Sequence, residues 1–351
     1  MNVMVAGGVG EHGRNCFYVT TATTTFILDC GLMAGSDEPY PYLTTEQIKR
    51  ADYLFISHSH KDHTGAYEWL INNGFLGRVI TTRETVRQLD FDVLNVDFIE
   101  ELTATKTPFQ LPESKMIVEW GKSGHCLGSV WFAITVDSEK IVYSGDYVET
   151  SNFYQVDPLR DNNADIAILD CAYGKDPVGA EKYCEKLLKK IKKLLVETDT
   201  IFLPVPKYGR NMDLLVLMFD CFQDVDLVCD DHLISELTRI SQAKEWVRED
   251  AFDKMEKMLE RIKPLANNSR GIIFICDPQL KNEYLQNSAE QILLDGGKIL
   301  LTGGVDKLSY SERLLHYGLA EKSKYSVHMN EQEMLELVGQ NDFAEIIPFH
   351  S

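Results

Sequence analysis

The chain begins with short runs of apolar and β-branched residues that glycine and aspartate separate. Four such runs fall in its first 57 residues: NVMVAGG, NCFYVTTA, TTFILDCG and ADYLFIS. Runs of this length and composition are typical of β-strands. Further strand patterns follow at GRVITT, MIVEW, SVWFAITV, KIVYSGD and ADIAILD. Between them, TGAYEWLINNG has helical spacing and stops at Gly74, which predicts one short helix.

The pattern changes after about residue 175. The segment GAEKYCEKLLKKIKKLLV places Leu187, Leu188, Ile191, Leu194 and Leu195 at helical spacing, with lysines on the other face. This spacing predicts an amphipathic helix that covers a sheet. A helix lying on a membrane surface has a similar pattern and is the alternative.

Strands and helices continue to alternate in the middle of the chain. TIFLPVP, GIIFICD and GKILLTGG have the composition of strands, and GRNMDLLVLMFDCF that of a helix. Residues 231–263 are highly charged and predict a long, solvent-facing helical segment. Near the end, NEQEMLELVGQ predicts a helix and EIIPFH a strand. The alternation indicates an α/β protein whose helices cover sheets.

Length and composition narrow the class of protein. A chain of 351 residues exceeds what one hydrophobic core usually supports, so we expect two packed units. No apolar run approaches the roughly 18 residues that span a bilayer, and the N-terminus lacks a secretory pattern. The eight cysteines include no CxxC pair, which argues against a disulfide framework and a thiolate zinc site. We therefore expect a cytoplasmic protein that does not contact membranes.

The formal net charge is −19, from 54 acidic and 35 basic residues. Non-specific nucleic-acid binding normally requires a basic excess, so the overall charge argues against it. A local basic channel beside a bound cation remains compatible with this charge.

The segment ISHSHKDHTGA concentrates four side chains that ligate metals: His58, His60, Asp62 and His63. In an extended chain, residues two apart point to the same side, so His58 and His60 would face one way. Asp62 and His63 follow where the chain turns into a helix. Two unlike pairs of ligands suit two adjacent metal ions, and imidazole and carboxylate are ligands that zinc accepts.

Further candidate ligands stand at the ends of later strand patterns. His125 follows MIVEW, Asp146 ends KIVYSGD, and His350 ends EIIPFH. A carboxylate at Asp146 could bridge two metals. Together with the cluster, these residues would complete a dinuclear site.

The motif H-x-H-x-D-H after a strand, followed by His125 and by Asp146 in S-G-D, resembles the metallo-β-lactamase fold. Other segments resemble β-CASP nucleases such as RNase J and the cleavage-and-polyadenylation endonuclease: GGVGEHGRNCF, ILDCAYG, LPVPKYGRNMDLLVL, LTGG and SVHMNEQEM. The resemblance implies an αββα sandwich at 1–175, completed by 321–351, with an inserted β-CASP α/β domain at 176–320.

The resemblance also implies a role for each candidate residue. His58, His60 and His125 would hold one zinc, Asp62, His63 and His350 the other, and Asp146 would bridge them. Manganese is an alternative metal. Asp29 would support the ligand loop from behind. Asp170 and His328 would form a hydrogen-bonded pair beside the metals. Asp62, Asp146, Asp170 and His328 are thus the predicted catalytic residues.

Contacts with the substrate are predicted in the second half of the chain. Glycine amides and basic side chains can bind phosphate oxygens, which nominates five residues: Lys207, Arg210, Gly303, Gly304 and Ser326. The cations could equally be solvated, and the glycines could serve a tight turn.

The sequence therefore predicts a zinc-dependent ribonuclease that acts on RNA or single-stranded DNA, by in-line attack of a hydroxide held between the metals. A metallo-β-lactamase-fold hydrolase of a small ester, lactone or nucleotide is one alternative. A non-catalytic scaffold subunit is another, although every ligand position is filled. A homo-oligomer remains open, because a partner chain could complete the last strand.

Overall fold

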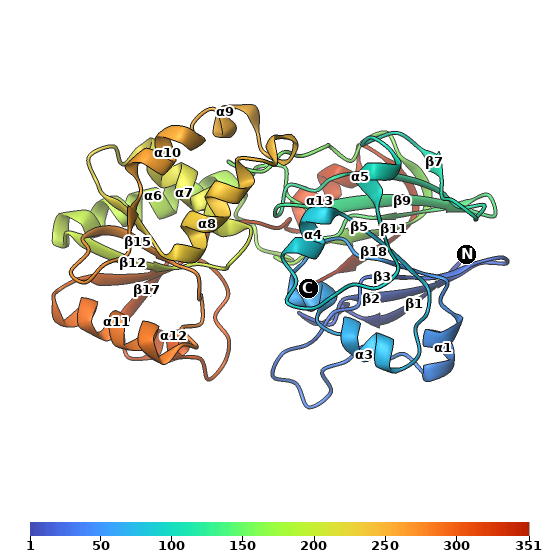
Figure 1. Ribbon diagram of the computed structural model, residues 1–351, viewed down its shortest axis with the longest axis horizontal. Helices are drawn as coiled ribbons and strands as arrows, with labels where there is room; N and C mark the ends of the chain where they lie inside the picture. Colours follow the sequence, from blue (N-terminus) through green and yellow to red (C-terminus); the bar gives the residue numbers. More distant parts are fainter. Residues whose placement is uncertain (351) are drawn as a thin grey trace. The chain divides into compact units, whose positions relative to one another are not determined.

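The computed structural model describes residues 1–350 and divides into two compact units (Figure 1). Unit 1 consists of Met1–Glu149, Val156–Pro177 and the C-terminal residues from His328 onward. Unit 2 consists of Thr150–Gln155 and Val178–Val327. This division differs from the predicted boundaries at residues 150–155 and 321–327, which belong to unit 2, and at residues 176–177, which belong to unit 1.

Unit 1 contains two six-stranded sheets. The first has the order β1-β2-β3-β4-β5-β6, where β1 to β3 are antiparallel and β3 to β6 are parallel. Its strands are β1 (Asn2–Gly7), β2 (Cys16–Thr20), β3 (Thr25–Leu28), β4 (Tyr53–Phe55), β5 (Arg78–Thr81) and β6 (Val96–Phe98).

The second sheet has the order β18-β11-β10-β9-β8-β7. Its strands are β7 (Phe109–Gln110), β8 (Ile117–Lys122), β9 (Val130–Val136), β10 (Glu139–Tyr143), β11 (Asn163–Asp170) and β18 (Asp342–Phe349). The last strand of the chain pairs in parallel with β11, and β11 pairs in parallel with β10. Three strands far apart in sequence therefore end at the same edge.

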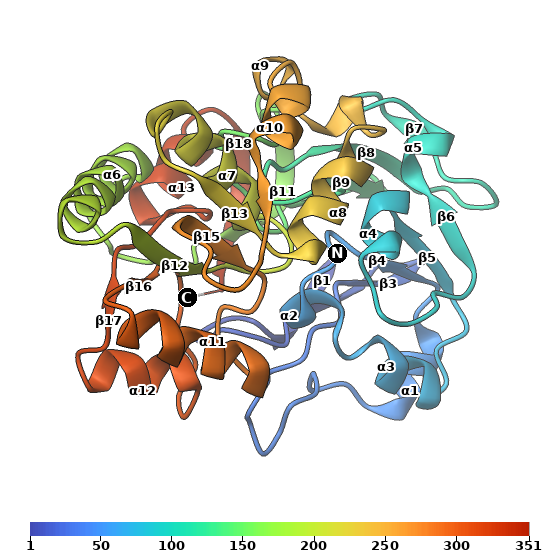
Figure 2. The same cartoon turned by 60° about the vertical axis from the view of Figure 1, so that its left-hand side comes forward.

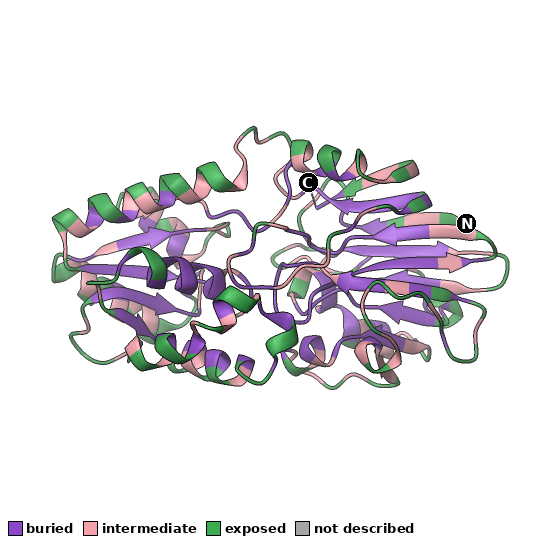
Figure 3. Cartoon of the chain, turned by 90° about the horizontal axis from the view of Figure 1, so that it is seen from above, coloured by how far each residue is buried: buried purple, intermediate pink, exposed green. Residues whose placement is uncertain are grey.

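Aromatic rings join the two sheets face to face. Phe17 of β2 contacts Tyr143 of β10 and Phe349 of β18, with ring centroids 5.7 and 5.5 Å apart. Phe55 of β4 meets Phe132 of β9 at 5.3 Å. These rings are fully buried, and Figure 3 shows that the strands are mostly buried along their length. Dense packing of this kind fixes the strand ends on which the candidate ligands stand.

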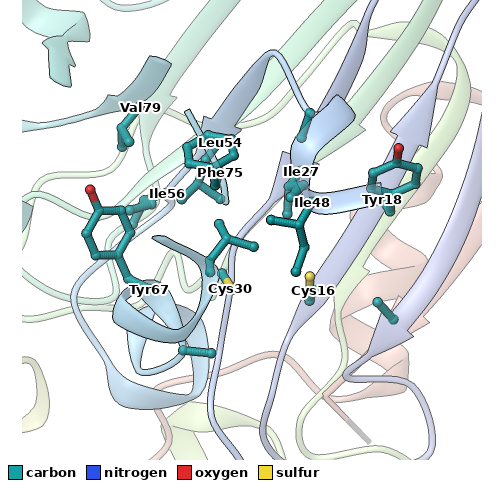
Figure 4. Packing of buried hydrophobic residues seen from close by; sticks show 14 residues of the cluster. Cys16, Tyr18, Ile27, Cys30, Ile48, Leu54, Ile56, Tyr67, Phe75 and Val79 are labelled. Atoms are coloured by element: carbon teal, nitrogen blue, oxygen red, sulfur yellow. The ribbon is translucent and has the colours of Figure 1, made fainter. Parts of the chain in front are cut away.

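Helices cover the outer faces of the unit 1 sheets. They are α1 (Thr45–Arg50), α2 (Lys61–Thr64), α3 (Tyr67–Asn72), α4 (Arg83–Arg87), α5 (Ile99–Leu102) and α13 (Glu331–Val338). Ile48 of α1 and Leu70 of α3 pack on the first sheet in a buried cluster with Leu54 and Val79 (Figure 4). Met334 and Leu337 of α13 pack on the second sheet with Trp131.

The single helix predicted at TGAYEWLINNG is present as α3, but a separate short helix precedes it, so the chain forms two helices between residues 61 and 72. The first, α2, begins earlier and contains Asp62 and His63. The Ala66 amide donates to the Cys30 carbonyl oxygen at 3.0 Å, which turns the chain before α3 begins at Tyr67. The break lets α2 point independently of α3.

Unit 2 is built on one parallel six-stranded sheet of order β14-β13-β15-β12-β16-β17. Its strands are β12 (Thr200–Pro204), β13 (Leu227–Cys229), β14 (Lys263–Pro264), β15 (Gly271–Ile275), β16 (Lys298–Leu301) and β17 (Ala320–Lys322). Parallel sheets are normally covered on both faces by helices.

The helices of unit 2 are α6 (Ala180–Glu197), α7 (Arg210–Cys221), α8 (Asp231–Ile240), η1 (Lys244–Trp246), α9 (Glu249–Phe252), α10 (Met255–Arg261), α11 (Glu283–Leu294) and α12 (Tyr310–His316). Figures 1 and 2 show α11 and α12 side by side. In the described residues, no helix is long and apolar enough to cross a membrane.

The long helical segment predicted at 231–263 is divided into four short helices. The division arises because Trp246 and Val247 are buried and pair with the segment that enters unit 2. The Gln155 amide donates to the Trp246 carbonyl at 2.9 Å, and the Arg248 amide donates to the Phe153 carbonyl at 2.9 Å. The α/β class predicted from the sequence is confirmed.

Candidate metal centre

The predicted ligands of unit 1 all stand at or just beyond the ends of secondary-structure elements. Four follow β4 or lie in α2, and the others follow β8, β10 and β18. In chain order they are His58, His60, Asp62, His63, His125, Asp146 and His350. The structure brings all seven together, in two groups of four that share Asp146.

The first group consists of His58, His60, His125 and Asp146. Nε2 of His58 and Nε2 of His125 each lie 3.4 Å from Oδ2 of Asp146. Nε2 of His125 lies 3.1 Å from Nδ1 of His60. Three imidazoles and one carboxylate oxygen therefore converge on a common point.

The second group consists of Asp62, His63, Asp146 and His350. Here the other oxygen of Asp146, Oδ1, lies 3.1 Å from Nε2 of His63 and 3.3 Å from Nδ1 of His350. Nε2 of His350 lies 3.0 Å from Oδ2 of Asp62. Each oxygen of Asp146 thus faces a different group, which is the arrangement that a bridging carboxylate requires.

These residues fit bound metal ions. Within each group, one possible ligand atom from every residue lies within 4.8 Å of the others. Nε2 of His58, Nε2 of His60, Oδ1 of Asp146 and Nδ1 of His350 are buried and accept or donate no hydrogen bond. Buried polar atoms without partners are costly, and a cation bound between them would remove that cost. Imidazole nitrogen and carboxylate oxygen are ligands of zinc, whereas oxygen-only sites suit magnesium or calcium.

The two groups differ in charge. Burial lowers the pKa of His60 to about 3 and holds the pKa of His125 well below its ordinary value. Burial acts in the same direction on His350, but Asp146 and Asp62 outweigh it and raise the pKa of His350 to about 10. His60 and His125 therefore offer neutral imidazoles, which are the form that ligates a metal, whereas the second group attracts positive charge.

Asp29, which the sequence nominated as a support, contacts the ligand loop directly. Its Oδ2 lies 2.7 Å from Nδ1 of His63, and its two oxygens accept hydrogen bonds from the Ser57 amide and hydroxyl at 2.7 and 2.6 Å. The Tyr143 hydroxyl donates to the same Oδ2 at 2.5 Å. Because Nδ1 of His63 faces Asp29, Nε2 is directed toward Asp146, and the carboxylate fixes the orientation of this imidazole.

The backbone of α2 is held against the loop after β3. The Cys30 amide donates to the His63 carbonyl at 2.8 Å, and the Asn15 amide donates to the Asp62 carbonyl at 2.8 Å. A Cβ atom at Gly31 would overlap the Asp62 carbonyl, so only glycine permits this approach. Packing of this kind positions Asp62 and His63 more precisely than a free loop could.

Two functional candidates have left-handed backbone conformations: Asp29 has φ 54° and His350 has φ 71°. Non-glycine residues adopt this region rarely, and histidine and aspartate more often than most. The amide of His350 is fixed by donation to the Gly8 carbonyl at 2.6 Å. Strained conformations that the surroundings enforce are common at functional sites.

The predicted pair of Asp170 and His328 is present beside the two groups. Nδ1 of His328 lies 3.1 Å from Oδ2 of Asp170 and 3.7 Å from Oδ2 of Asp146. Asp170 is fully buried and accepts from the Tyr147 and Ala172 amides at 3.0 Å each. The His328 side chain keeps 14% of its surface exposed, so its ring connects a fixed carboxylate with solvent.

The predicted substrate contacts lie in unit 2. Lys207 precedes α7, Arg210 begins it, Gly303 and Gly304 follow β16, and buried Ser326 follows β17. The structure brings two of them together, because the Arg210 guanidinium lies directly against Gly303, where a Cβ atom would overlap it.

Sequence reasoning missed several residues of the site. Tyr143 was assigned only to a strand, and Ser57 and Asn15 were not singled out. Nδ2 of Asn15 lies 2.9 Å from Nε2 of His63. His12 was not singled out either, and its ring lies 5.5 Å from that of His350. The position of His12 and Asn15 in GEHGRN, within the segment that resembles RNase J, was the available signal.

Comparison with known proteins agrees with this geometry. The chain is 25% identical to "Probable RNase MJ4" of Methanocaldococcus jannaschii over 325 residues, which cover 86% of this chain and 74% of that protein. It is 29% identical to transcription termination factor FttA of Lokiarchaeum sp., over 68% of this chain and 42% of that protein. Integrator complex subunit 11 of Danio rerio is 26% identical over 98% and 68%.

The fold also has a solved counterpart. A crystal structure of a protein of unknown function from Enterococcus faecalis V583 superposes with a TM-score of 0.61 and 12% identity, covering 99% of this chain and 93% of that one. These relatives, one of which is named as an RNase, confirm the resemblance to β-CASP nucleases found in the sequence. The model of the Metallo-beta-lactamase superfamily matches residues 9–203, which is more than half of the chain, and the protein therefore belongs to that superfamily.

Proposed function

We propose that the protein is a metal-dependent ribonuclease of the β-CASP type that hydrolyses phosphodiester bonds of RNA. The observation that carries this proposal is the pair of ligand groups sharing Asp146, with the Asp170–His328 pair beside them. The names of the relatives, which include an RNase, support a nuclease over a hydrolase of small esters or lactones. The fully filled ligand set argues against a scaffold subunit.

Zinc is the metal that we propose for both groups, with manganese as the alternative. His58, His60 and His125 would hold one ion and Asp62, His63 and His350 the other, with one oxygen of Asp146 on each. When bound, two such ions supply Lewis-acid stabilisation of charge on phosphate and activation of water at neutral pH.

The chain itself orients the reactants. Asp146 is 1% exposed and is fixed between four imidazoles, so its oxygens can align a water molecule with little freedom. Asp62 is held by His350, whose Nε2 lies 3.0 Å from Oδ2 of Asp62. Fixed groups of this kind reduce the entropy that is lost on reaching the transition state.

His328 is the proposed general acid. With Nδ1 turned toward Asp170, its Nε2 is the nitrogen that can carry a proton to the leaving 3′ or 5′ oxygen of RNA. The buried carboxylate of Asp170 keeps the ring in one orientation. A positioned acid of this type contributes roughly 10²–10⁴-fold to the rate.

Phosphate binding by unit 2 completes the proposal. The Arg210 guanidinium rests on Gly303, where the absence of a side chain lets it approach the backbone. Its role in this proposal is to bind a phosphate together with the neighbouring backbone amides. Lys207, Gly304 and Ser326 are the additional proposed contacts. Replacing Gly303 by alanine would displace Arg210 and should weaken RNA binding without loss of metal.

One experiment tests the function. The protein is loaded with zinc or manganese, its metal content is measured, and end-labelled RNA, single-stranded DNA and a small ester are offered as substrates. The expected result is about two metal ions per chain and cleavage of RNA. The His60→Ala variant should not cleave RNA and should bind less metal.

Other outcomes would redirect the proposal. Two metal ions per chain with hydrolysis of the ester but not of RNA or DNA would support a small-substrate hydrolase instead. Less than one metal ion per chain, with no hydrolysis of any substrate, would support a scaffold. Cleavage that persists in His60→Ala would show that a contaminating nuclease is being measured.

A further inference from the structure

We propose that the outer face of α6 in unit 2 is a binding surface for the sugar-phosphate backbone of single-stranded RNA. The proposal rests on the ribonuclease function above and adds to it a substrate-binding surface made of residues that the sequence motifs do not include. Four lysines define this surface: Lys182, Lys186, Lys189 and Lys193. We refer to them as the lysine stripe.

The lysine stripe follows from the register of the helix. Its members are four, three and four residues apart, which places them on one side of an α-helix at successive rises of about 6, 4.5 and 6 Å. All four are exposed. The buried residues of α6 are Leu187, Ile191 and Leu194, and they lie on the other side of the helix. The stripe therefore runs about 16 Å along the helix.

Helix α6 carries a positive net charge, although the whole chain is strongly negative. α6 contains six lysines and three glutamates, whereas the whole chain has a formal net charge of −19. A basic helix on an acidic protein attracts a polyanion locally. The acidic surfaces elsewhere carry the same sign of charge as the polyanion and would repel it.

The ion pairs that the stripe makes within its own helix are weak. Nζ of Lys189 lies 3.9 Å from Glu185, and Nζ of Lys193 lies 4.0 Å from Glu197. Both lysine side chains are more than two-thirds exposed, and exposed pairs of this kind contribute little to stability. The ammonium groups can therefore exchange these partners for phosphate oxygens at small cost.

An aromatic ring extends the stripe at its N-terminal end. Nζ of Lys186 lies 5.4 Å from the ring centroid of Tyr183, and Nζ of Lys324 lies 4.7 Å from it. Lys324 follows β17, so the basic surface spans two elements of unit 2. Cations grouped around an aromatic ring are the combination that single-stranded nucleic acids bind, through phosphate contacts and base stacking.

The alternative of a membrane-surface helix does not fit the structure. A helix of that kind needs its apolar side free to enter lipid. In α6 that side is occupied, because Leu187 and Ile191 are fully buried and Leu194 is 1% exposed. The polyanion bound by the remaining lysine side must therefore be recognised by charge from solution, as RNA is.

The test compares two variants with four substitutions each. The stripe variant replaces Lys182, Lys186, Lys189 and Lys193 by glutamine. The matched control replaces four other exposed lysines of unit 2 by glutamine: Lys257, Lys263, Lys281 and Lys307. All these side chains are exposed, so both variants should fold, which circular dichroism and thermal unfolding verify.

Binding of a fluorescent 20-nucleotide single-stranded RNA is measured by anisotropy in EDTA at several salt concentrations. Each phosphate contact contributes about 0.7 to the slope of log K against log salt for single strands, so loss of four contacts should reduce the slope by about 3. The stripe variant should bind at least tenfold more weakly at low salt, whereas the control should bind like the parent.

Cleavage separates this proposal from the proposed function. The stripe variant should show a raised KM for the 20-nucleotide RNA and an unchanged kcat. If the stripe variant has the parent's RNA affinity and salt slope, the proposed RNA-binding surface is wrong, but the proposed ribonuclease function is unaffected. A parent protein that binds RNA through the stripe but never cleaves it would overturn the function instead. Tighter stripe-dependent binding to anionic lipid vesicles or polyglutamate than to RNA would assign the surface to another partner and overturn the proposal.

Discussion

The Tyr143 hydroxyl donates a hydrogen bond of 2.5 Å to Oδ2 of Asp29, the oxygen that also contacts Nδ1 of His63. All three residues are fully buried. Burial and the negative charge of Asp29 raise the pKa of Tyr143 well above its ordinary value, so the hydroxyl keeps its proton and always acts as the donor. A line of three side chains therefore runs from the second sheet to a candidate metal ligand.

Tyr143→Phe should weaken metal binding while preserving the fold. The phenylalanine ring keeps the contacts with Phe17 and Phe349, but Asp29 loses a donor that fixes its orientation toward His63. Partners behind metal ligands typically contribute 10–100-fold to affinity, and we expect a loss of about tenfold. Competition with a chromophoric chelator measures the zinc dissociation constant directly.

Tyr147→Phe is the matched control for this change. Tyr147 is also a fully buried tyrosine of unit 1, but its hydroxyl donates to Glu149 and contacts no candidate ligand. Its zinc affinity should equal that of the parent. If both variants lose affinity equally, the effect comes from general loosening of unit 1, and Tyr143 has no specific positioning role.

Single ligand replacements should remove one metal ion at a time. His125→Ala disrupts the group with three imidazoles, and His350→Ala disrupts the group with Asp62 and His63. Because only Asp146 is shared, each variant should retain about one of two metal ions after dialysis, as measured by mass spectrometry of the metal. His316→Ala, an exposed histidine of unit 2, should retain both. Loss of all metal in both variants would show that the two groups bind cooperatively and do not act as separate sites.

His328→Gln should reduce the cleavage rate without removing metal. If His328 protonates the leaving oxygen, kcat for RNA should fall by roughly 10²–10⁴-fold. An aryl phosphodiester has a leaving group that needs no proton, so its hydrolysis should be nearly unaffected. Equal losses for RNA and the aryl substrate would indicate that His328 positions Asp170 or the substrate and donates no proton.

The metal centre was accessible to sequence reasoning because its ligands are recognisable one by one. Four of them are packed into six positions, and His125, Asp146 and His350 each follow a run that is plainly a strand. Because each of these runs is followed by a residue of ligand type, local patterns were enough to suggest a common site, which the structure assembles from strand ends of both sheets of unit 1.

The supporting residues were not accessible in the same way. Tyr143 lies 114 positions from Asp29, and within KIVYSGD it is indistinguishable from any buried aromatic residue of a strand. Its role depends on how the two sheets pack face to face, which is a property of tertiary structure. Likewise, His12 is 338 positions from His350. The two rings meet because the loop between β1 and β2 contacts the end of β18 in the folded protein.

Asp213 is a further residue whose environment contradicts its sequence pattern. It occupies the first turn of α7, in GRNMDLLVL, where a carboxylate often faces solvent, yet it is 1% exposed. Its Oδ1 accepts from the Ser151 hydroxyl at 2.9 Å and from the Asn152 and Phe153 amides at 2.5 and 3.1 Å. It thereby holds the segment that enters unit 2.

The burial of Asp213 should make the free energy of unfolding depend on pH. Burial raises its pKa from 3.8 to about 7, although the three hydrogen bonds oppose the shift. Between these values the folded protein keeps a proton that the unfolded chain has released. The contribution to stability is therefore fully present below about pH 4, and it is lost as pH rises to about 7, by up to about 4 kcal/mol.

Asp213→Asn should remove this dependence, because asparagine keeps an oxygen that can accept the same hydrogen bonds but has no proton to lose. Urea unfolding at pH 5 and pH 8 in EDTA measures the free energy of unfolding of each protein. The control is Asp224→Asn, which replaces an exposed carboxylate just after the same helix. The parent and the control should lose stability from pH 5 to pH 8 relative to Asp213→Asn. If the free energy of unfolding changes equally with pH in all three proteins, Asp213 is ionised throughout this range and does not titrate. The segment 150–155 would then be held by a charged carboxylate that only the three hydrogen-bond donors stabilise.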